Sequence, residues 1–256
     1  MTAYFATVAG LFGLLIGSFL NVVAYRVPLG RSVVSPPSAC PECGYRIRPR
    51  DNIPVLSWLL LRGKCRQCGA GISARYPIVE AATGILFAGT YLVLGTVWVL
   101  PAYLLFVGTT VTLILTDLDH KRIPNRILYP ATVAAVFLLA LGAAADGKLD
   151  VLPRALAGGA IYFGILLLIA LAARGGFGMG DVKLAFLLGT FLAFDSWATL
   201  WAGIFLAFLI GGVVSLLLLV TRRKGRKDAI PFGPPLIVGA WIAVIWGRQL
   251  VDWYMG

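Results

Sequence analysis

The chain has 256 residues, of which 59% are hydrophobic and only 13% are charged, and its mean hydropathy is +0.89. This composition excludes an ordinary soluble globular domain and is typical of a polytopic membrane protein. The formal net charge of +11 would favour nucleic-acid binding in a soluble protein, but here the basic residues follow the loops between apolar runs. We therefore expect topology and anionic lipid, not nucleic acid, to account for the charge.

Eight apolar runs are long enough, or nearly long enough, for a membrane helix, which needs about 20 residues. The first run has no basic residue before it and no clear cleavage site, so we expect it to stay as a helix and not to be a signal peptide. The runs are 3–25, 77–95, 97–117, 127–145, 153–173, 181–195, 197–220 and 234–250. Only the letters FDSW separate the sixth run from the seventh, so a count of seven is the alternative.

The basic residues predict the orientation. With eight spans both termini lie on one side, and all but three of the 22 Lys and Arg residues lie toward the other side. The exceptions are Lys148, Arg154 and Arg248. Because basic loops stay in the cytoplasm, we predict a multi-pass protein of the bacterial cytoplasmic membrane. Its termini face outward, and its long loop, residues 26–76, faces the cytoplasm.

All four cysteines lie in this loop, as CPECG and CRQCG. Two residues between thiolates let one tight turn place both sulfurs on one metal, and two such turns make a tetrahedral site that suits zinc. Two disulfides or free thiols are the alternatives, but disulfides do not persist in the cytoplasm. We expect a structural zinc ion on Cys40, Cys43, Cys65 and Cys68. The predicted domains are therefore a first helix (1–25), a small zinc-binding domain (26–76) and a membrane domain (77–256).

Four acids lie close to predicted spans: Glu80, Asp117, Asp119 and Asp181. Acids within membrane helices are candidates for function. Asp117 ends the third span and Asp181 opens the sixth, so both lie at the cytoplasmic end and helix packing can bring them together. Two close carboxyl groups cannot both ionise cheaply, and the pair can share a proton as in aspartic proteases. Asp119 is better explained as a helix end near water.

The glycines of GFGMG, just before Asp181, fit the same hypothesis. They break helix geometry and let a substrate backbone approach the acid closely. The start of the sixth span also offers free amides, and its positive dipole end favours a carboxylate there.

These residues resemble the bacterial type IV prepilin peptidases, which are GxGD aspartyl proteases, nearly from end to end. The stretches that carry the resemblance are GSFLNVVAYRVP, CPECGYRIRPRDNIPVLSWLLLRGKCRQCGAGISARYPIVE, DLDHKRIPN, GMGDVK and IPFGPPLIVGA. GxGD alone is weak evidence, whereas five motifs in this order are specific. The resemblance selects Asp117, seven residues before Pro124, over Asp119. It implies an all-α membrane peptidase with Asp117 and Asp181 as its catalytic residues.

The resemblance also implies substrates and a second activity. The substrates are prepilins of type IV pili and pseudopilins of type II secretion, each with a basic leader before a hydrophobic helix that lies in the bilayer. The second activity is N-methylation of the new amino terminus with S-adenosylmethionine, associated with the cysteine-bearing domain. Gly63 and Lys64, beside Cys65, are candidate cofactor-binding residues by resemblance alone.

Two other hypotheses explain some of the same residues. A proton-coupled transporter also uses paired carboxylates within the membrane, but the cysteine domain and the absence of internal repeats argue against it. A noncatalytic assembly scaffold is disfavoured because both aspartates are present.

Overall fold

The computed structural model describes residues 1–172, 178–221 and 231–255, with a few side chains near the C-terminus left out. The described chain is helical, and its only bridges between extended segments are two isolated ones. The elements are α1 (Thr2–Arg26), η1 (Pro49–Asp51), α2 (Leu56–Leu60), α3 (Arg75–Leu94), α4 (Leu100–His120), α5 (Asn125–Ala145), α6 (Val151–Ala172), α7 (Met179–Asp195), α8 (Trp197–Val220) and α9 (Gly233–Met255). The predicted all-α membrane fold is confirmed.

Each of the eight predicted spans corresponds to one long helix of the described chain. Six of these helices, α1, α3, α4, α5, α6 and α8, are long and apolar enough to cross a membrane. The other two are shorter: α7 has 17 residues, and the apolar part of α9 is Gly233–Gly247. The protein is therefore a multi-pass membrane protein, and α7 and α9 are the two predicted spans that fall below the length of an apolar membrane-crossing helix.

The boundary at FDSW separates two helices. Ser196 has extended backbone angles, φ −165° and ψ 164°, which no helix accommodates. Its hydroxyl accepts a hydrogen bond from the backbone N–H of Thr199 at 3.0 Å, so it caps α8. The Arg154 guanidinium donates to the carbonyls of Ala193, Phe194 and Asp195 at the end of α7, which satisfies acceptors that the helix leaves free.

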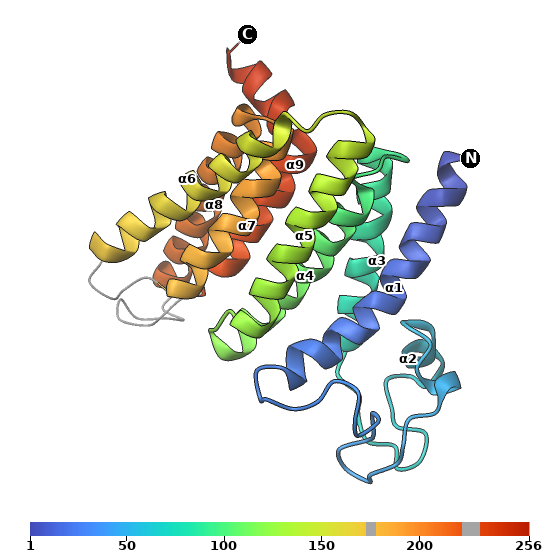
Figure 1. The fold of residues 1–256 in the computed structure, drawn as a ribbon. Helices are drawn as coiled ribbons and strands as arrows, with labels where there is room; N and C mark the ends of the chain where they lie inside the picture. Colours follow the sequence, from blue (N-terminus) through green and yellow to red (C-terminus); the bar gives the residue numbers. More distant parts are fainter. Residues whose placement is uncertain (173–177, 222–230, 256) are drawn as a thin grey trace. The chain divides into compact units, whose positions relative to one another are not determined.

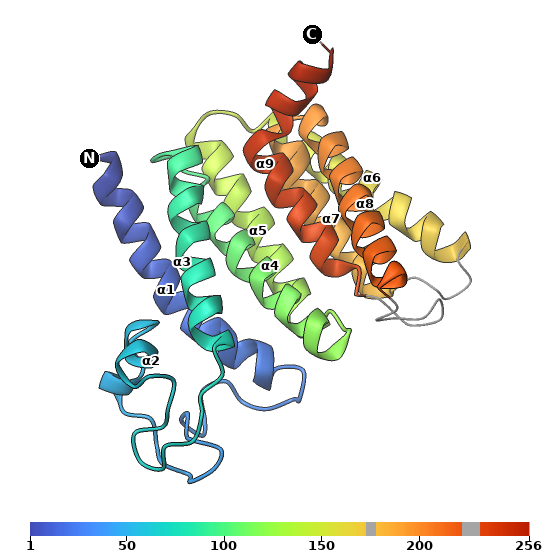
Figure 2. The same ribbon diagram turned by 180° about the vertical axis from the view of Figure 1, so that it is seen from behind.

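The first compact unit, Met1–Leu115, is built on the pair α1 and α3, which lie side by side in both views (Figures 1 and 2). Glycines make this pairing close. A Cβ on Gly13 would lie 2.8 Å from the carbonyl oxygen of Thr83, and one on Gly17 would lie 2.8 Å from the Cα of Glu80. Small residues let membrane helices approach backbone to backbone. This unit also carries the cysteine-bearing loop.

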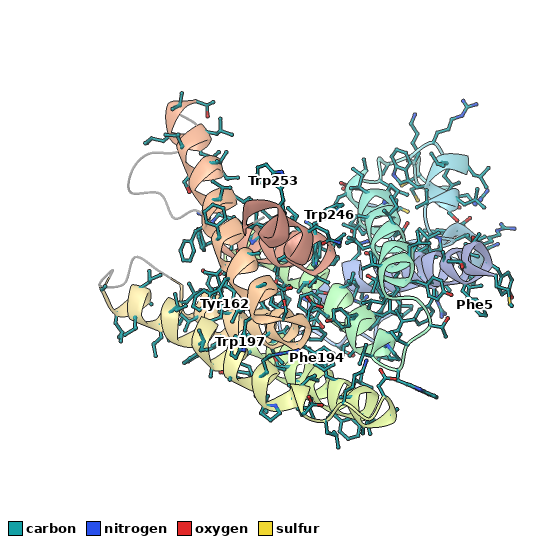
Figure 3. The ribbon with its side chains drawn as sticks, turned by 90° about the horizontal axis from the view of Figure 1, so that it is seen from above. Phe5, Tyr162, Phe194, Trp197, Trp246 and Trp253 are labelled. Atoms are coloured by element: carbon teal, nitrogen blue, oxygen red, sulfur yellow. The ribbon has the colours of Figure 1, made fainter. Side chains whose placement is uncertain are left out.

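The second unit, Thr116–Gly256, is organised around α7. This helix contacts α5, α6, α8 and α9, and most of its residues are buried. Looking along the helices, Tyr162 of α6 lies inside the unit, whereas Trp253 projects from α9 (Figure 3). The predicted domain boundaries at residues 25 and 76 do not coincide with the division into these two units. The three predicted domains therefore stay a prediction about which part of the chain carries which function.

The contact of α6 with α7 depends on Gly189. A Cβ there would lie 2.5 Å from the carbonyl oxygen of Gly158 and 2.9 Å from the Cβ of Tyr162, and neither neighbour can move without moving its helix. We expect Gly189→Ala to lower the free energy of unfolding by about 1–3 kcal/mol. Gly164→Ala, at a position with nothing within 4 Å, is the matched control. Reversible unfolding in mixed micelles measures both, and equal stabilities would contradict the prediction.

Candidate active site and cysteine cluster

Asp117 lies in the last turn of α4 and is 5% exposed. Its Oδ2 accepts a hydrogen bond from the backbone N–H of Gly233 at 3.1 Å. Gly233 is the first residue of α9 and is followed by Pro234 and Pro235, which have no N–H. The N–H of Gly233 is thus the donor that this helix start offers, at the positive end of the helix dipole.

Asp181 lies in the first turn of α7 and is 8% exposed. A Cβ built on Gly233 would be 2.8 Å from Oδ2 of Asp117 and 3.5 Å from Oδ1 of Asp181. Both carboxyl groups therefore border one point beside the start of α9. The structure brings together two acids that the sequence separates by 64 positions, and both belong to the second unit. One water molecule or one peptide group is small enough to touch both.

The described glycines near Asp181 have partners within the chain. A Cβ on Gly178 would lie 2.9 Å from Oδ2 of Asp181, and one on Gly180 would lie 3.0 Å from the Cβ of Ile123. Gly178 therefore gives the carboxyl group room, and Gly180 lets α7 begin against the segment that follows α4. Gly176, which we also expected to admit a substrate, lies outside the described residues.

Two other charged side chains lie near the end of α4 and the start of α7, namely Asp119 and Lys183. Lys183 donates to the side chain of Asn125 at 3.3 Å and its ammonium lies 5.5 Å from the ring centre of Tyr129. It joins the start of α7 to the start of α5. Asp119 is exposed, as we expected for a helix end near water.

The four cysteine sulfurs lie within 4.8 Å of one another, and those of Cys40 and Cys68 are 3.8 Å apart. A tetrahedron of sulfurs at a zinc–sulfur distance of about 2.3 Å has edges of about 3.8 Å. The arrangement therefore fits a tetrahedral S4 metal site. Four thiolates leave no open coordination position, so such a metal would be structural.

Each cysteine pair is held by the same turn. The N–H of Gly44 donates to the carbonyl of Cys40, and the N–H of Gly69 donates to that of Cys65, each at 2.9 Å. Both glycines have positive φ, 71° and 75°, where a side chain would be strained. The backbone N–H groups of Cys68 and Gln67 then point at the Cys65 sulfur and lower the pKa of that thiol to about 7. Such amides favour the thiolate that a metal requires.

An ion pair joins the second cysteine turn to η1. The guanidinium of Arg66 donates to Oδ1 of Asp51 at 2.9 and 2.7 Å. Its hydrogen bonds hold the pKa of the Asp51 carboxyl below its ordinary value. The ion pair therefore connects η1, which lies between the two cysteine turns in the chain, to the second of these turns.

Comparison with known proteins gives the family. Residues 11–94 match the bacterial peptidase A24 N-terminal domain, and residues 104–216 match the type IV leader peptidase family. The chain belongs to the type IV leader peptidase family. It is 36% identical to a prepilin leader peptidase/N-methyltransferase of Pseudomonas aeruginosa, over 96% of this chain and 91% of the relative. Proteins of the same name from Aeromonas hydrophila and Bacillus subtilis are each 34% identical, over 98% and 96% of this chain and 94% and 96% of the relatives. No solved structure matches the chain.

Membership of this family supports the peptidase hypothesis, and no comparison supports the transporter hypothesis. The structure also directs attention to Gly233, which the sequence analysis includes only as part of IPFGPPLIVGA. The signal that could have found it is local: a glycine followed by two prolines at a helix start, where one backbone N–H remains available to bind an anion.

Gly63 has a structural explanation besides the resemblance. Its φ is 66°, and a Cβ on it would lie 2.8 Å from the indole ring of Trp58. The indole N–H in turn donates to the carbonyl of Ile72 at 3.0 Å. The ring of Trp58 therefore accounts for glycine at this position, whereas the neighbouring Lys64 is exposed.

Proposed function

We propose that this chain removes the leader of type IV prepilins and type II secretion pseudopilins, with Asp117 and Asp181 as its catalytic residues. Membership of the family and the names of the relatives support the reaction. The observation that carries the choice of residues is that both carboxyl groups border the same point beside Gly233.

In the proposed reaction, one ionised carboxyl group takes a proton from a water molecule whose oxygen attacks the scissile carbonyl carbon. The other, protonated, carboxyl group donates its proton to the carbonyl oxygen. When the tetrahedral intermediate collapses, the C–N bond breaks and the first carboxyl group gives the leaving nitrogen the proton that it took from water. The second carboxyl group takes a proton back from a hydroxyl of the intermediate, which restores the starting state of the site. The products are a leader with a new carboxylate and a pilin with a new amino terminus. No covalent intermediate with the enzyme forms.

The site would face the cytoplasm. The support is the distribution of basic residues, most of which lie on the side where we expect α4 to end and α7 to begin. A prepilin whose hydrophobic helix lies in the bilayer would then present its cleavage point at this depth. We place the protein in the bacterial cytoplasmic membrane on the same grounds.

The direct test uses detergent-solubilised protein and a prepilin. Loss of the leader, followed by mass spectrometry of the new amino terminus, is the expected result. A transporter or a scaffold would leave the prepilin intact, and that outcome would refute the proposal.

We further propose that Cys40, Cys43, Cys65 and Cys68 hold one structural zinc ion. Bound zinc would fix the two turns relative to each other and would contribute to the folding of a loop too small for an apolar core. We expect Cys43→Ser to lose the metal and to make residues 26–76 more susceptible to proteolysis. Elemental analysis of the purified protein tests this, and wild-type protein free of metal would contradict it.

We also propose that the chain N-methylates the new amino terminus, as the names of its relatives state for them. The methyl donor is S-adenosylmethionine, with Gly63 and Lys64 as candidate binding residues. We expect Lys64→Ala to lower methylation and to leave leader cleavage intact, because the acids lie in the other unit. A mass increase of one methyl group on the cleaved pilin, measured for both proteins, distinguishes the two activities. Equal methylation would exclude Lys64.

A further inference from the structure

The cysteine-bearing loop contains an apolar run that neither the metal site nor leader cleavage explains. Residues 53–61 read IPVLSWLLL, within a loop that otherwise has nine basic and two acidic side chains. The run forms the short helix α2 and the turn that precedes it. In a domain surrounded by water, such a run would turn its side chains inward.

Four apolar side chains of this run are instead exposed. Ser57 is buried, and its hydroxyl donates to the carbonyl of Arg50 at 3.0 Å. It also accepts from the N–H of Ile53 at 2.9 Å, so the polar residue faces the interior of the domain. Leu59 is 57% exposed and Leu60 is 73% exposed. Leu56 and Ile53 are exposed as well. We call these four side chains the apolar patch, and exposed apolar side chains gathered in one short segment are typical of an interaction surface.

A buried carboxylate ties this segment to a membrane helix. Glu80 of α3 accepts a hydrogen bond from the N–H of Val55 at 2.7 Å. Val55 has φ 61°, which a β-branched residue adopts only when its surroundings impose it. Glu80 is in turn beside Gly17 of α1, so α2 is attached to the surface of the α1–α3 pair.

The position of this attachment gives the depth of α2. Glu80 is in the second turn of α3, and α1 continues for nine residues beyond Gly17, to Arg26, which is roughly 13 Å of helix. In both views α2 lies at the height of the last turns of α1, and the loops with the cysteines lie farther out (Figures 1 and 2). The exposed leucines are therefore at the level where the membrane helices end.

Basic side chains flank the apolar patch. Arg50 precedes α2, and Arg62 and Lys64 follow it; all three are exposed. A short helix with leucines on one face and Lys or Arg at its ends is the pattern of a segment that lies in the membrane interface. The apolar face enters the acyl-chain boundary, while the cations stay among anionic headgroups.

We propose that residues 53–62 form an interfacial membrane segment whose partner is anionic lipid. Leu56, Leu59 and Leu60 lie in the acyl-chain boundary of the leaflet at the basic side. Arg50 and Arg62 contact the headgroups. The hydrogen bond of Glu80 to Val55 sets the height of the segment, so the cysteine-bearing loop is held against the bilayer.

The test is a depth measurement that does not use cleavage, so its result is independent of the proposed peptidase activity. The photoreactive residue p-benzoylphenylalanine replaces Leu60 in the full chain, reconstituted in nanodiscs of phosphatidylcholine and phosphatidylglycerol without substrate. The control carries it at Glu42, which is exposed in the first cysteine turn. After irradiation we expect at least about fivefold more lipid adduct from position 60. Position 59 is the second site if the first variant does not fold.

Two results would overturn the proposal. Equal lipid labelling from positions 60 and 42 would place α2 in water. A covalent dimer from position 60 would show that a second copy of the chain covers the patch. A separate measurement tests the headgroup contact. Phosphatidylglycerol should be enriched among the lipid adducts, and the double variant Arg50→Gln with Arg62→Gln should remove this enrichment. Adducts at the bulk lipid ratio would refute that contact.

Discussion

Asp117→Asn and Asp181→Asn should each lower the rate of leader cleavage by about 10²–10⁴-fold. An asparagine has the shape of the aspartate but can neither take a proton from water nor give one to the scissile carbonyl. Because the two acids act on one water and one carbonyl in the proposed reaction, we expect the double variant to be no slower than the slower single variant. Single-turnover cleavage of a prepilin in detergent measures all three.

The matched control is Asp119→Asn. This acid is two residues from Asp117 in the same helix and is exposed, so its replacement should leave cleavage unchanged. If either of the two buried-acid variants cuts at the wild-type rate, that residue is not catalytic. If Asp119→Asn is the slow variant instead, the assignment made from the spacing to Pro124 is wrong.

Gly233→Ala should lower cleavage by about 10²-fold with little change in stability. The added Cβ would lie 2.8 Å from Oδ2 of Asp117, and a carboxyl group at the end of a short side chain can move aside more easily than a backbone can. The helix therefore persists, while the carboxyl group leaves its place beside Asp181. A displacement of about 1 Å at a reacting group is enough for a loss of this size.

The control for Gly233→Ala is Gly212→Ala, in α8, where nothing lies within 4 Å. It should cleave as the wild-type protein does. Thermal unfolding of both variants, measured beside their cleavage rates, separates a moved carboxyl group from a disturbed fold. A Gly233→Ala protein that unfolds much earlier than the wild type would show that the glycine serves packing instead.

Much of this fold can be predicted from the sequence because membrane helices have a strong and simple sequence pattern. A bilayer requires about 20 apolar residues and charged loops, and all eight predicted runs are helices. The pairing of the helices is harder to predict. It depends on which glycines meet which carbonyls, and Gly189 against Gly158 has no signature in a chain with 30 glycines.

The candidate acids were predictable for a similar reason, since a carboxyl group at a membrane boundary is costly and therefore conspicuous. Their surroundings were not. The glycines before Asp181 read as space for a substrate, whereas Gly178 gives room to the carboxyl group itself and Gly180 to Ile123. The hydrogen bond from Gly233 joins positions 116 residues apart, and only the folded chain shows it.

The start of α9 has a consequence for how such a site can work. At the start of an ordinary helix, several backbone N–H groups are free to donate hydrogen bonds to one anion from more than one direction. Here two successive imino acids have removed the others, so Asp117 is tethered through a single main-chain contact. A single contact fixes one oxygen and does not by itself fix the plane of the carboxyl group. In the reaction that we propose, rotation about this contact would let Asp117 reach both a water molecule and an incoming peptide bond.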